Sequence, residues 1–375
     1  MQVTRRLVAL VAASALFAAA CAGGSATPAP ATQAPATAGA SGEAPASEAP
    51  TIDFKACAAF DAAGLGDKGF NDLALKGLKD AEAAGYQTAY AESTGATDYA
   101  SNIQRLMDEG CQSVVVVGFE QTQAAIEATL ANPDIAFAQV DAVWDETANG
   151  PTPANFTGLD FQIDEAATLA GYLAAGFSES GIVGTYGGEQ YPGVTRFMDG
   201  YHAGIKIYNE RKAASVRLLG WDAAKQTGTF VGGDNPWGDL AKGEQLAKNF
   251  LDQGADIVGP VAGATGTASI KAMAAADKWA IGVDTDQALS LPEYSKAILT
   301  SAEKRIDVAV LEVITKNAGG DLGGENFMGT LANNGVALSP VHDLDAQVPD
   351  ELKAEIEQLA ADIASGAILV ADYLE

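Results

Sequence analysis

Short apolar runs alternate with amphipathic segments along this 375-residue chain from residue 52 onward. The runs are rich in valine, alanine and isoleucine, whereas the segments between them repeat their apolar residues with the period of a helix. This alternation is typical of parallel sheets whose strands are joined by crossover helices. It therefore predicts an α/β protein.

The boundaries of the predicted elements follow from these two patterns. The predicted strands are Lys55–Ala62, Gln87–Ala91, Ser113–Gly118, Ala136–Val140, Gly181–Tyr186, Ile257–Val261, Trp279–Val283 and Ala297–Thr300. The predicted helices are Asn71–Ala84, Tyr99–Glu109, Gln121–Ala131, Asp164–Phe177, Thr195–Asn209, Leu240–Gln253, Thr267–Ala275 and Ala302–Asn317. So many units favour two doubly wound lobes, with a ligand cleft where the carboxyl ends of their strands face each other.

The N-terminal segment indicates export. Arg5 and Arg6 precede an apolar run, Leu7–Ala20, that is typical of a signal-peptide core. The run ends in Ala18-Ala19-Ala20-Cys21, which resembles the bacterial lipobox. We therefore expect a lipoprotein signal peptide at 1–20 and an acylated Cys21; the alternative, an ordinary secretory signal, also exports the chain. Residues 21–51 are expected to form a disordered tether of Ala, Pro, Ser and Thr.

The charge balance argues against several classes of partner. The chain has 49 acidic and 22 basic residues, a formal charge of −27, and removing residues 1–20 takes away two positive charges. Such an acidic surface repels phosphate backbones and anionic lipid head groups, so nucleic acid is not an expected partner. With two histidines and three cysteines, no His-rich or Cys-rich metal site can be assembled, and no metal or cofactor is expected.

Two cysteines remain beyond Cys21. Cys57 lies near the start of the first predicted strand, and Cys111 lies just before the strand at Ser113. In an oxidising compartment the two can form a disulfide if those strands are parallel neighbours, and otherwise they are two separate buried thiols.

A glycine-rich turn follows the first strand. Its residues 64–69 fit the GxGxxG pattern of dinucleotide-binding proteins, and Glu92 lies near the expected ribose acid. The export signal and the charged pair Asp67-Lys68 inside the turn argue against NAD. We therefore interpret it as a binding turn of another kind.

Eight ordered blocks of sequence resemble the basic membrane protein family, the substrate-binding lipoproteins of ABC importers related to the purine nucleoside receptor A lipoprotein. The first is Phe60–Asn71, which has Gly69 where the family usually has serine. The other seven are Asn155–Phe161, Leu169–Ala175, Val183–Gly188 with Pro192–Val194 and Phe197–Tyr201, Gln253–Val258, Val261–Gly266, Ile281–Gln287 and Leu299–Arg305. The resemblance implies a two-lobed fold of the type I periplasmic-binding-protein kind with the ligand in the interlobe cleft.

The resemblance also implies two aromatic walls for a base. Phe70, with Asn71 beside it as a source of paired donors and acceptors, resembles the first wall; the alternative for this pair is a hydrophobic staple and a helix N-cap. Trp237 resembles the second wall, although Trp221 or Phe230 could replace it because residues 222–239 are longer than the family norm. Asp67 belongs to the opening signature.

The other implied ligand contacts are polar. Asp284 corresponds to an acid that binds ribose hydroxyls, with Asp286 as the residue that would instead cap the next segment. Lys304 resembles the family lysine that reaches the sugar, and Gly263 allows the backbone to approach. From the residues themselves, Asp141 at a strand end is the candidate for reading a base edge, which favours a purine, and Asp160 competes with it.

No catalytic motif is present, as there is no GxSxG, HExxH or P-loop pattern. We therefore expect a monomeric, lipid-anchored solute-binding protein on the extracytoplasmic side of the cell membrane, which delivers a nucleoside to an ABC permease. The expected lobes are 52–157 with 297–324, and 158–296 with 325–375. The alternatives are a binding protein for a sugar or vitamin, an exported glycosidase or dehydrogenase, and a surface adhesin or sensor.

Overall fold

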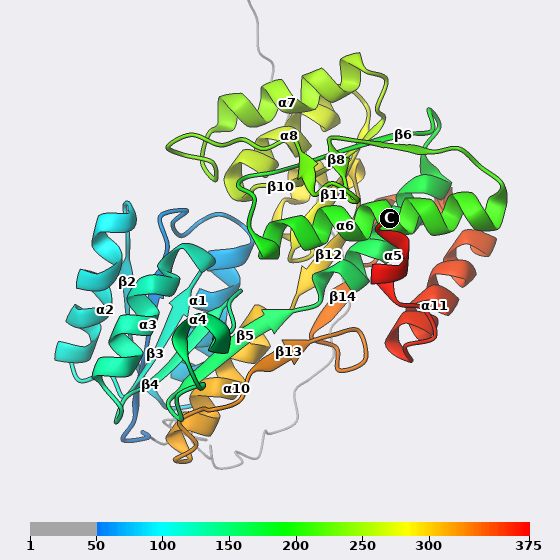
Figure 1. Cartoon of the computed structure of the whole chain (residues 1–375). Coiled ribbons are helices and arrows are strands. Elements are labelled where there is room, and N and C mark those ends of the chain that lie inside the picture. The colour runs from blue at the N-terminus through cyan, green and yellow to red at the C-terminus, as the bar shows by residue number, and fades with distance from the viewer. Residues whose placement is uncertain (1–50) are drawn as a thin grey trace, which may run out of the picture. The chain divides into compact units, whose positions relative to one another are not determined.

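The computed structural model describes residues 51–375. The expected signal peptide, Cys21 and the tether up to residue 50 lie outside the described residues. The described part contains two six-stranded sheets with the orders β13-β5-β4-β3-β1-β2 and β14-β12-β11-β10-β6-β7 (Figure 1). All pairings within these two sheets are parallel except that of β12 with β14, which confirms the predicted α/β class.

The first lobe is built on the sheet that contains β1. Its strands are β1 (Lys55–Phe60), β2 (Gln87–Glu92), β3 (Ser113–Val117), β4 (Ala136–Val140), β5 (Phe156–Phe161) and β13 (Phe327–Gly329). Its helices are α1 (Phe70–Ala83), α2 (Tyr99–Asp108), α3 (Thr122–Ala131), α4 (Glu146–Asn149) and α10 (Ile306–Ala318). Helices α1 and α10 pack together on one face and α2 and α3 on the other, so every residue of the Ser-Val-Val-Val-Val strand β3 is buried.

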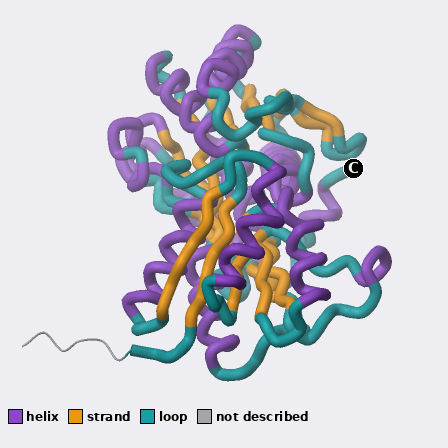
Figure 2. The backbone as a smooth tube through the Cα atoms, turned by 90° about the vertical axis from the view of Figure 1, so that its left-hand side faces the viewer, coloured by secondary structure: helices purple, strands orange, loops and turns teal. Residues whose placement is uncertain are grey.

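The second lobe has the same layers. Its strands are β6 (Ile182–Gly187), β7 (Arg217–Leu219), β10 (Ile257–Val261), β11 (Trp279–Asp284), β12 (Ile298–Lys304) and β14 (Val336–Leu338), with a small ribbon of β8 (Trp221–Asp222) and β9 (Thr227–Gly228). Its helices are α5 (Ile163–Phe177), α6 (Pro192–Lys212), α7 (Leu240–Asp252), α8 (Gly263–Ala275), α9 (Gln287–Ser290) and α11 (Asp350–Ala364). Helix α5 packs against α6, α11 and β12, and α7 packs against α8 (Figure 1). Figure 2 shows helices on both sides of the strands.

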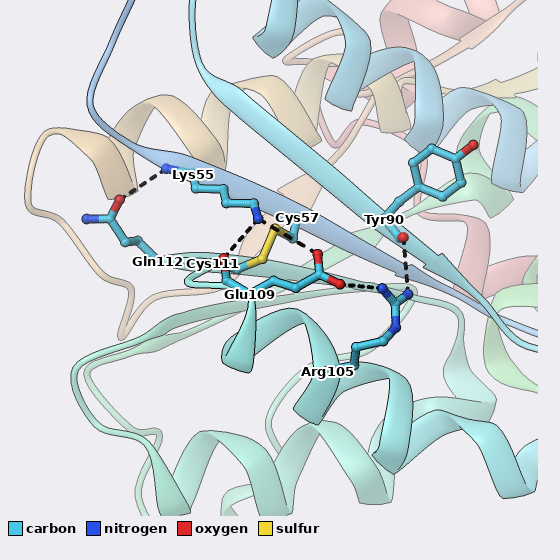
Figure 3. The surroundings of a disulfide bond; sticks show 7 residues. All are labelled: Lys55, Cys57, Tyr90, Arg105, Glu109, Cys111 and Gln112. Carbon is cyan, nitrogen blue, oxygen red and sulfur yellow. Dashed lines mark hydrogen bonds and ion pairs between the residues drawn. A yellow bond between two sulfur atoms is a disulfide. The ribbon is translucent and has the colours of Figure 1, made fainter.

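A disulfide joins Cys57 to Cys111 (Figure 3). Strands β1 and β3 are parallel neighbours, and this places the two sulfurs near the N-terminal ends of the strands. Around the disulfide, the Lys55 ammonium donates to the Glu109 carbonyl and Arg105 forms an ion pair with the Glu109 carboxylate. Of the two arrangements left open by the sequence, the structure contains the bonded pair.

The chain changes lobes at other residues than expected. The expected boundary between 157 and 158 falls inside β5, which pairs along its length with β4 and β13 of the first sheet. The expected first-lobe stretch 297–324 is divided, because β12 belongs to the second sheet while α10 packs on the first. Sequence periodicity indicates that a segment is a strand, but only tertiary pairing decides which sheet it joins.

Two further differences concern single elements. The helix predicted from Ala302 begins only at Ile306, because β12 continues to Lys304. Strands β5, β7, β8, β9, β13 and β14 and helices α4, α9 and α11 were not predicted. The extension of β12 matters for the site, since it places Lys304 at the carboxyl end of a strand rather than on a solvated helix.

Candidate functional site

A cavity lies where the carboxyl ends of strands from the two sheets meet. Its walls include residues at or just after the ends of β1, β3 and β4 in the first sheet and of β10, β11 and β12 in the second. All eight residues predicted as ligand contacts line it: Asp67, Phe70, Asn71, Asp141, Trp237, Gly263, Asp284 and Lys304. The rule that open parallel sheets bind ligands at their carboxyl ends therefore located the cavity correctly.

The loop before α1 is folded around carboxylates of its own. Asp67 accepts hydrogen bonds from the backbone N–H groups of Gly69, Asn71 and Asp72 at 2.8–3.2 Å. Although Asp67 lines the cavity, these bonds make it a residue that positions the first turn of α1 and hence Phe70. Burial raises its pKa.

The same loop explains why the GxGxxG pattern does not indicate a dinucleotide site. A phosphate would need free backbone N–H groups there. Those of Gly66 and Lys68 instead donate to the Asp72 carboxylate, and that of Gly69 donates to Asp67. Two carboxylates in the turn would repel a pyrophosphate.

Asn71 and Asp61 form a buried pair at the start of α1. The Asn71 side-chain amide donates to Asp61 Oδ1 at 2.9 Å, and Asn71 Oδ1 is buried without a partner in the protein. Burial raises the pKa of Asp61 to about 7, and the nearby negative charges of Glu120 and Asp67 add to this effect. Asn71 is therefore not the helix N-cap considered for it, since Gly69 occupies that position.

Lys304 lies among carboxylates and rings from both lobes. Its ammonium donates to Asp141 Oδ2 at 2.6 Å and lies 4.0 Å from Asp284 Oδ1. The ring centroids of Phe70 and Phe197 are 5.5 and 5.1 Å from it. With 2 % of its side chain exposed, this lysine is a buried cation held by both lobes.

The two aspartates beside Lys304 have unusual backbone angles and raised pKa values. Asp141, which follows β4, and Asp284, which ends β11, have φ values of 62° and 66°, a left-handed conformation that is uncommon for non-glycine residues. Burial raises the pKa of Asp284 to about 7 despite the Lys304 charge, and it raises the pKa of Asp141 as well. Asp141 Oδ1 is buried and has no partner in the protein.

Trp237 enters the cavity from the loop between β9 and α7. Its carbonyl accepts a hydrogen bond from the Thr265 N–H at 3.0 Å, which attaches the loop to the first turn of α8. Gly263 starts that helix with a φ of 52°, and a Cβ there would lie 3.4 Å from the Trp237 carbonyl. The glycine thus suits both the backbone angle and the close approach of the loop.

Three residues that the sequence left open as alternative site residues lie outside the cavity lining. Trp221 is buried within the second lobe and donates to Asp199 at 2.8 Å. Asp160 is held by the Arg196 guanidinium at 2.8 Å, outside the cavity lining. Asp286 caps α9 and contacts the His342 ring at 2.6 Å.

Several cavity residues were missed by sequence reasoning, namely Asp61, Phe119, Glu120, Tyr191, Gly193 and Phe197. Asp61 was placed inside a strand predicted to end at Ala62, whereas β1 ends at Phe60. With the correct end, the strand-end rule that selected Asp141 would also have selected Asp61. Glu120 follows β3 closely and could have been found by the same rule.

No helix among the described residues 51–375 is long and apolar enough to cross a membrane.

Comparisons with known proteins agree on one family. The family model described as "ABC transporter substrate-binding protein PnrA-like" matches residues 54–372. Basic membrane protein A1 of Borrelia garinii is 30 % identical over 81 % of this chain and 84 % of its own length. An ABC transporter nucleoside-binding protein, BmpA of Lactococcus lactis, is 30 % identical over 85 % of this chain and 89 % of its own length.

Solved structures show the same fold. A solute-binding protein of an ABC transporter system from Aeropyrum pernix matches with a TM-score of 0.74 and 24 % identity, over 84 % of this chain and 92 % of that one. Another, from Conexibacter woesei, matches with a TM-score of 0.65 over 84 % of this chain and 97 % of that one. The expected two-lobed fold of periplasmic-binding-protein type is thereby confirmed.

Proposed function

Because this chain belongs to the PnrA-like family of ABC transporter substrate-binding proteins, and so is a binding protein and not an enzyme, we propose that it captures a nucleoside in the interlobe cavity. The observation that carries the proposal is the pairing of two aromatic side chains with unsatisfied polar groups in one cavity. Phe70 comes from the first lobe and Trp237 from the second, and the buried oxygens Asn71 Oδ1 and Asp141 Oδ1 lack partners in the protein. Buried polar atoms without partners are costly unless a ligand satisfies them.

The chemistry of the cavity suits a ligand with a flat apolar part and a polyol part. Phe70 and Trp237 provide rings on which a base can stack. Asp284 accepts hydrogen bonds from ribose hydroxyls, Lys304 donates to ribose oxygens, and Gly263 gives the ligand access to the backbone. Asp141 retains one oxygen, and acceptance there from a ring N–H and an exocyclic amine together, as on guanine, favours a purine.

The name of the Lactococcus lactis relative supports this choice of ligand, since that protein is described as nucleoside-binding. A sugar has no flat aromatic face to place between the two rings, so it fits the cavity less well than a base with its ribose.

We further propose that the protein works as a monomer and hands its ligand to an ABC permease after the lobes close. Contacts across the cleft support closure, because the Lys304–Asp141 pair joins the second lobe to the first. A binding protein of this kind is recognised in its ligand-bound conformation, so capture and delivery are linked by a hinge movement.

Membrane attachment through Cys21 is part of the proposal and lies outside the described residues. Replacement of Cys21 by serine removes the sulfur that would be acylated. The Cys21→Ser variant should therefore move from the detergent phase to the aqueous phase in a phase-partition assay, while the wild type stays in the detergent phase.

The experiment that tests the proposed ligand is calorimetric titration of the purified protein with purine and pyrimidine nucleosides, free bases, ribose and NAD. We expect nucleosides to bind more tightly than ribose or the free bases alone. Phe70→Ala should weaken nucleoside binding about 5- to 150-fold, the range for loss of one base–aromatic contact. The control is Tyr90→Ala on strand β2, whose side chain is exposed and outside the cavity lining. If only ribose or another solute binds, the proposed transport role stands and the proposed nucleoside ligand is wrong.

A further inference from the structure

Trp237 makes a contact that stacking does not require. Its indole N–H, from the second lobe, donates to Glu120 Oε1 of the first lobe at 3.0 Å. The other carboxylate oxygen, Oε2, accepts from the hydroxyl of Tyr99 at 2.8 Å. Tyr99 is the first residue of α2 and is 3 % exposed, so Glu120 is anchored to the body of the first lobe.

Glu120 is therefore satisfied without a ligand, although it lines the cavity. One oxygen is held within its own lobe and the other reaches across the cleft. A phenyl ring at position 237 could stack on a base equally well but could not make this bond, because only the indole carries a donor.

The contact stands at the mouth of the cavity. Next to it, the rings of Phe119 from the first lobe and Tyr191 from the second are 5.1 Å apart. These four residues, Phe119, Glu120, Tyr191 and Trp237, line both the cavity and an outer groove that also includes residues 93–96 and 233–236. They separate the ligand space from that groove, so a ligand that leaves on this side must part them.

We propose that the Trp237–Glu120 hydrogen bond is a latch that holds the lobes closed and slows release of the ligand. The inference rests on the proposed function, since it concerns the same cavity. The same side chain provides the stacking ring and the latch, so a base that fixes the ring also fixes the donor. Glu120 acts as a positioning residue through its hydrogen bond to the Trp237 indole.

The test is a stopped-flow measurement of nucleoside release from Trp237→Phe, which keeps a ring and loses the donor. We expect its dissociation rate to rise about tenfold, as for loss of a hydrogen bond to a charged group, with the association rate changed less than twofold. The matched control is Trp221→Phe, which also loses an indole-to-carboxylate bond, to Asp199, but within the second lobe and away from the cavity. It should lower stability and leave the dissociation rate unchanged.

A double-mutant cycle identifies the partner. Glu120→Gln keeps an acceptor oxygen without the charge and should raise the dissociation rate by less than Glu120→Ala does. Adding Trp237→Phe to Glu120→Ala should have little further effect, because the two substitutions break one bond. Additive effects would mean that the residues act separately and would overturn the latch.

A second readout does not depend on any ligand. In small-angle X-ray scattering of the ligand-free proteins, Trp237→Phe should have a larger radius of gyration than both the wild type and Trp221→Phe. If the wild type binds nucleosides but Trp237→Phe changes neither release nor the scattering, the latch is wrong and the proposed function stands. If the wild type binds no nucleoside, the proposed function fails, and an unchanged radius of gyration in Trp237→Phe then overturns the latch independently.

Discussion

The buried carboxylates around Lys304 are the residues whose charge the fold makes most costly. Asp284 is 9 % exposed, and desolvation outweighs the attraction of the Lys304 ammonium 4.0 Å away. Under the proposed function this cost has a use, because a carboxylate accepts hydrogen bonds from a polyol. The fold would then give up stability at single positions in exchange for ligand contacts.

Asp284→Asn should change the pH dependence of stability. The folded pKa of about 7 exceeds the ordinary value of 3.8, so the native state binds more protons than the unfolded state between these pH values. The contribution of Asp284 to the free energy of unfolding is therefore full below pH 4 and is lost as the pH rises through 7.

The asparagine variant lacks this loss, so it should gain stability relative to the wild type as the pH rises from 4 to 8, by up to about 4 kcal/mol. Urea unfolding of the ligand-free proteins across this range measures the difference. Exposed Asp134→Asn is the control, and a constant difference for Asp284→Asn would contradict the prediction.

At this scale the sequence located part of the cavity lining. Strand-end position and the family blocks identified Phe70, Trp237, Asp284 and Lys304 as candidates, and all four line the cavity. They could not reveal that Asp67 is occupied by backbone N–H groups, because that depends on the path of a loop.

At the scale of the elements, the disulfide crosslinks the first lobe at the strand ends far from the cavity. The disulfide joins β1 to the residue two positions before β3, while the cavity lies at the opposite ends of the same strands. The cavity-lining residues and the disulfide are therefore separated by the length of a strand.

Replacement of Cys57 and Cys111 by serine should lower stability and leave ligand affinity unchanged. The bonded cysteines are 54 residues apart, and a loop of that length corresponds to about 4 kcal/mol of chain entropy in the unfolded state. Thermal unfolding with and without reductant should show the wild type approaching the double variant only when reduced. A weaker nucleoside affinity in the variant would contradict the prediction that the disulfide does not influence the cavity.

Sequence patterns predicted best the elements with a marked apolar run or a clear helical period. Strand β3 is a continuous apolar run and helix α2 has a clear helical period, and both were predicted within one residue of their ends. Strands β13 and β14 have three residues each, too few to show a period, and β5 is interrupted by Gly158 and Asp160.

At the scale of the whole described part, residues 51–375, two lobes touch across a cleft, and one close approach there requires a residue without a side chain. Gly193 lies in the first turn of α6, and a Cβ on it would be 2.5 Å from Asp141 Oδ2 of the other lobe. Because Asp141 is held by Lys304, it is not free to move aside.

Gly193→Ala should therefore weaken closure and not folding. Alanine is more favourable than glycine in a helix by up to about 1 kcal/mol, so the ligand-free protein should keep or raise its melting temperature. Nucleoside affinity should fall at least about tenfold, as expected for steric overpacking at the interface. Calorimetry and thermal unfolding together check this; unchanged affinity would mean that the lobes do not approach this closely when the ligand is bound.

The chain passes between the lobes at three neighbouring places, after β5, after β12 and between β13 and β14. Backbone hydrogen bonds tie these passages together, from Gln162 to Gly329 and from Arg305 to Gly335. The first sheet lacks its edge strand until residue 329 is available, and the second lacks its own until residue 338. During synthesis, neither half can finish before nearly the entire polypeptide has emerged, so the chain stays incompletely folded for most of its time on the ribosome. A protein that crosses a membrane as an extended thread would benefit from such a late assembly.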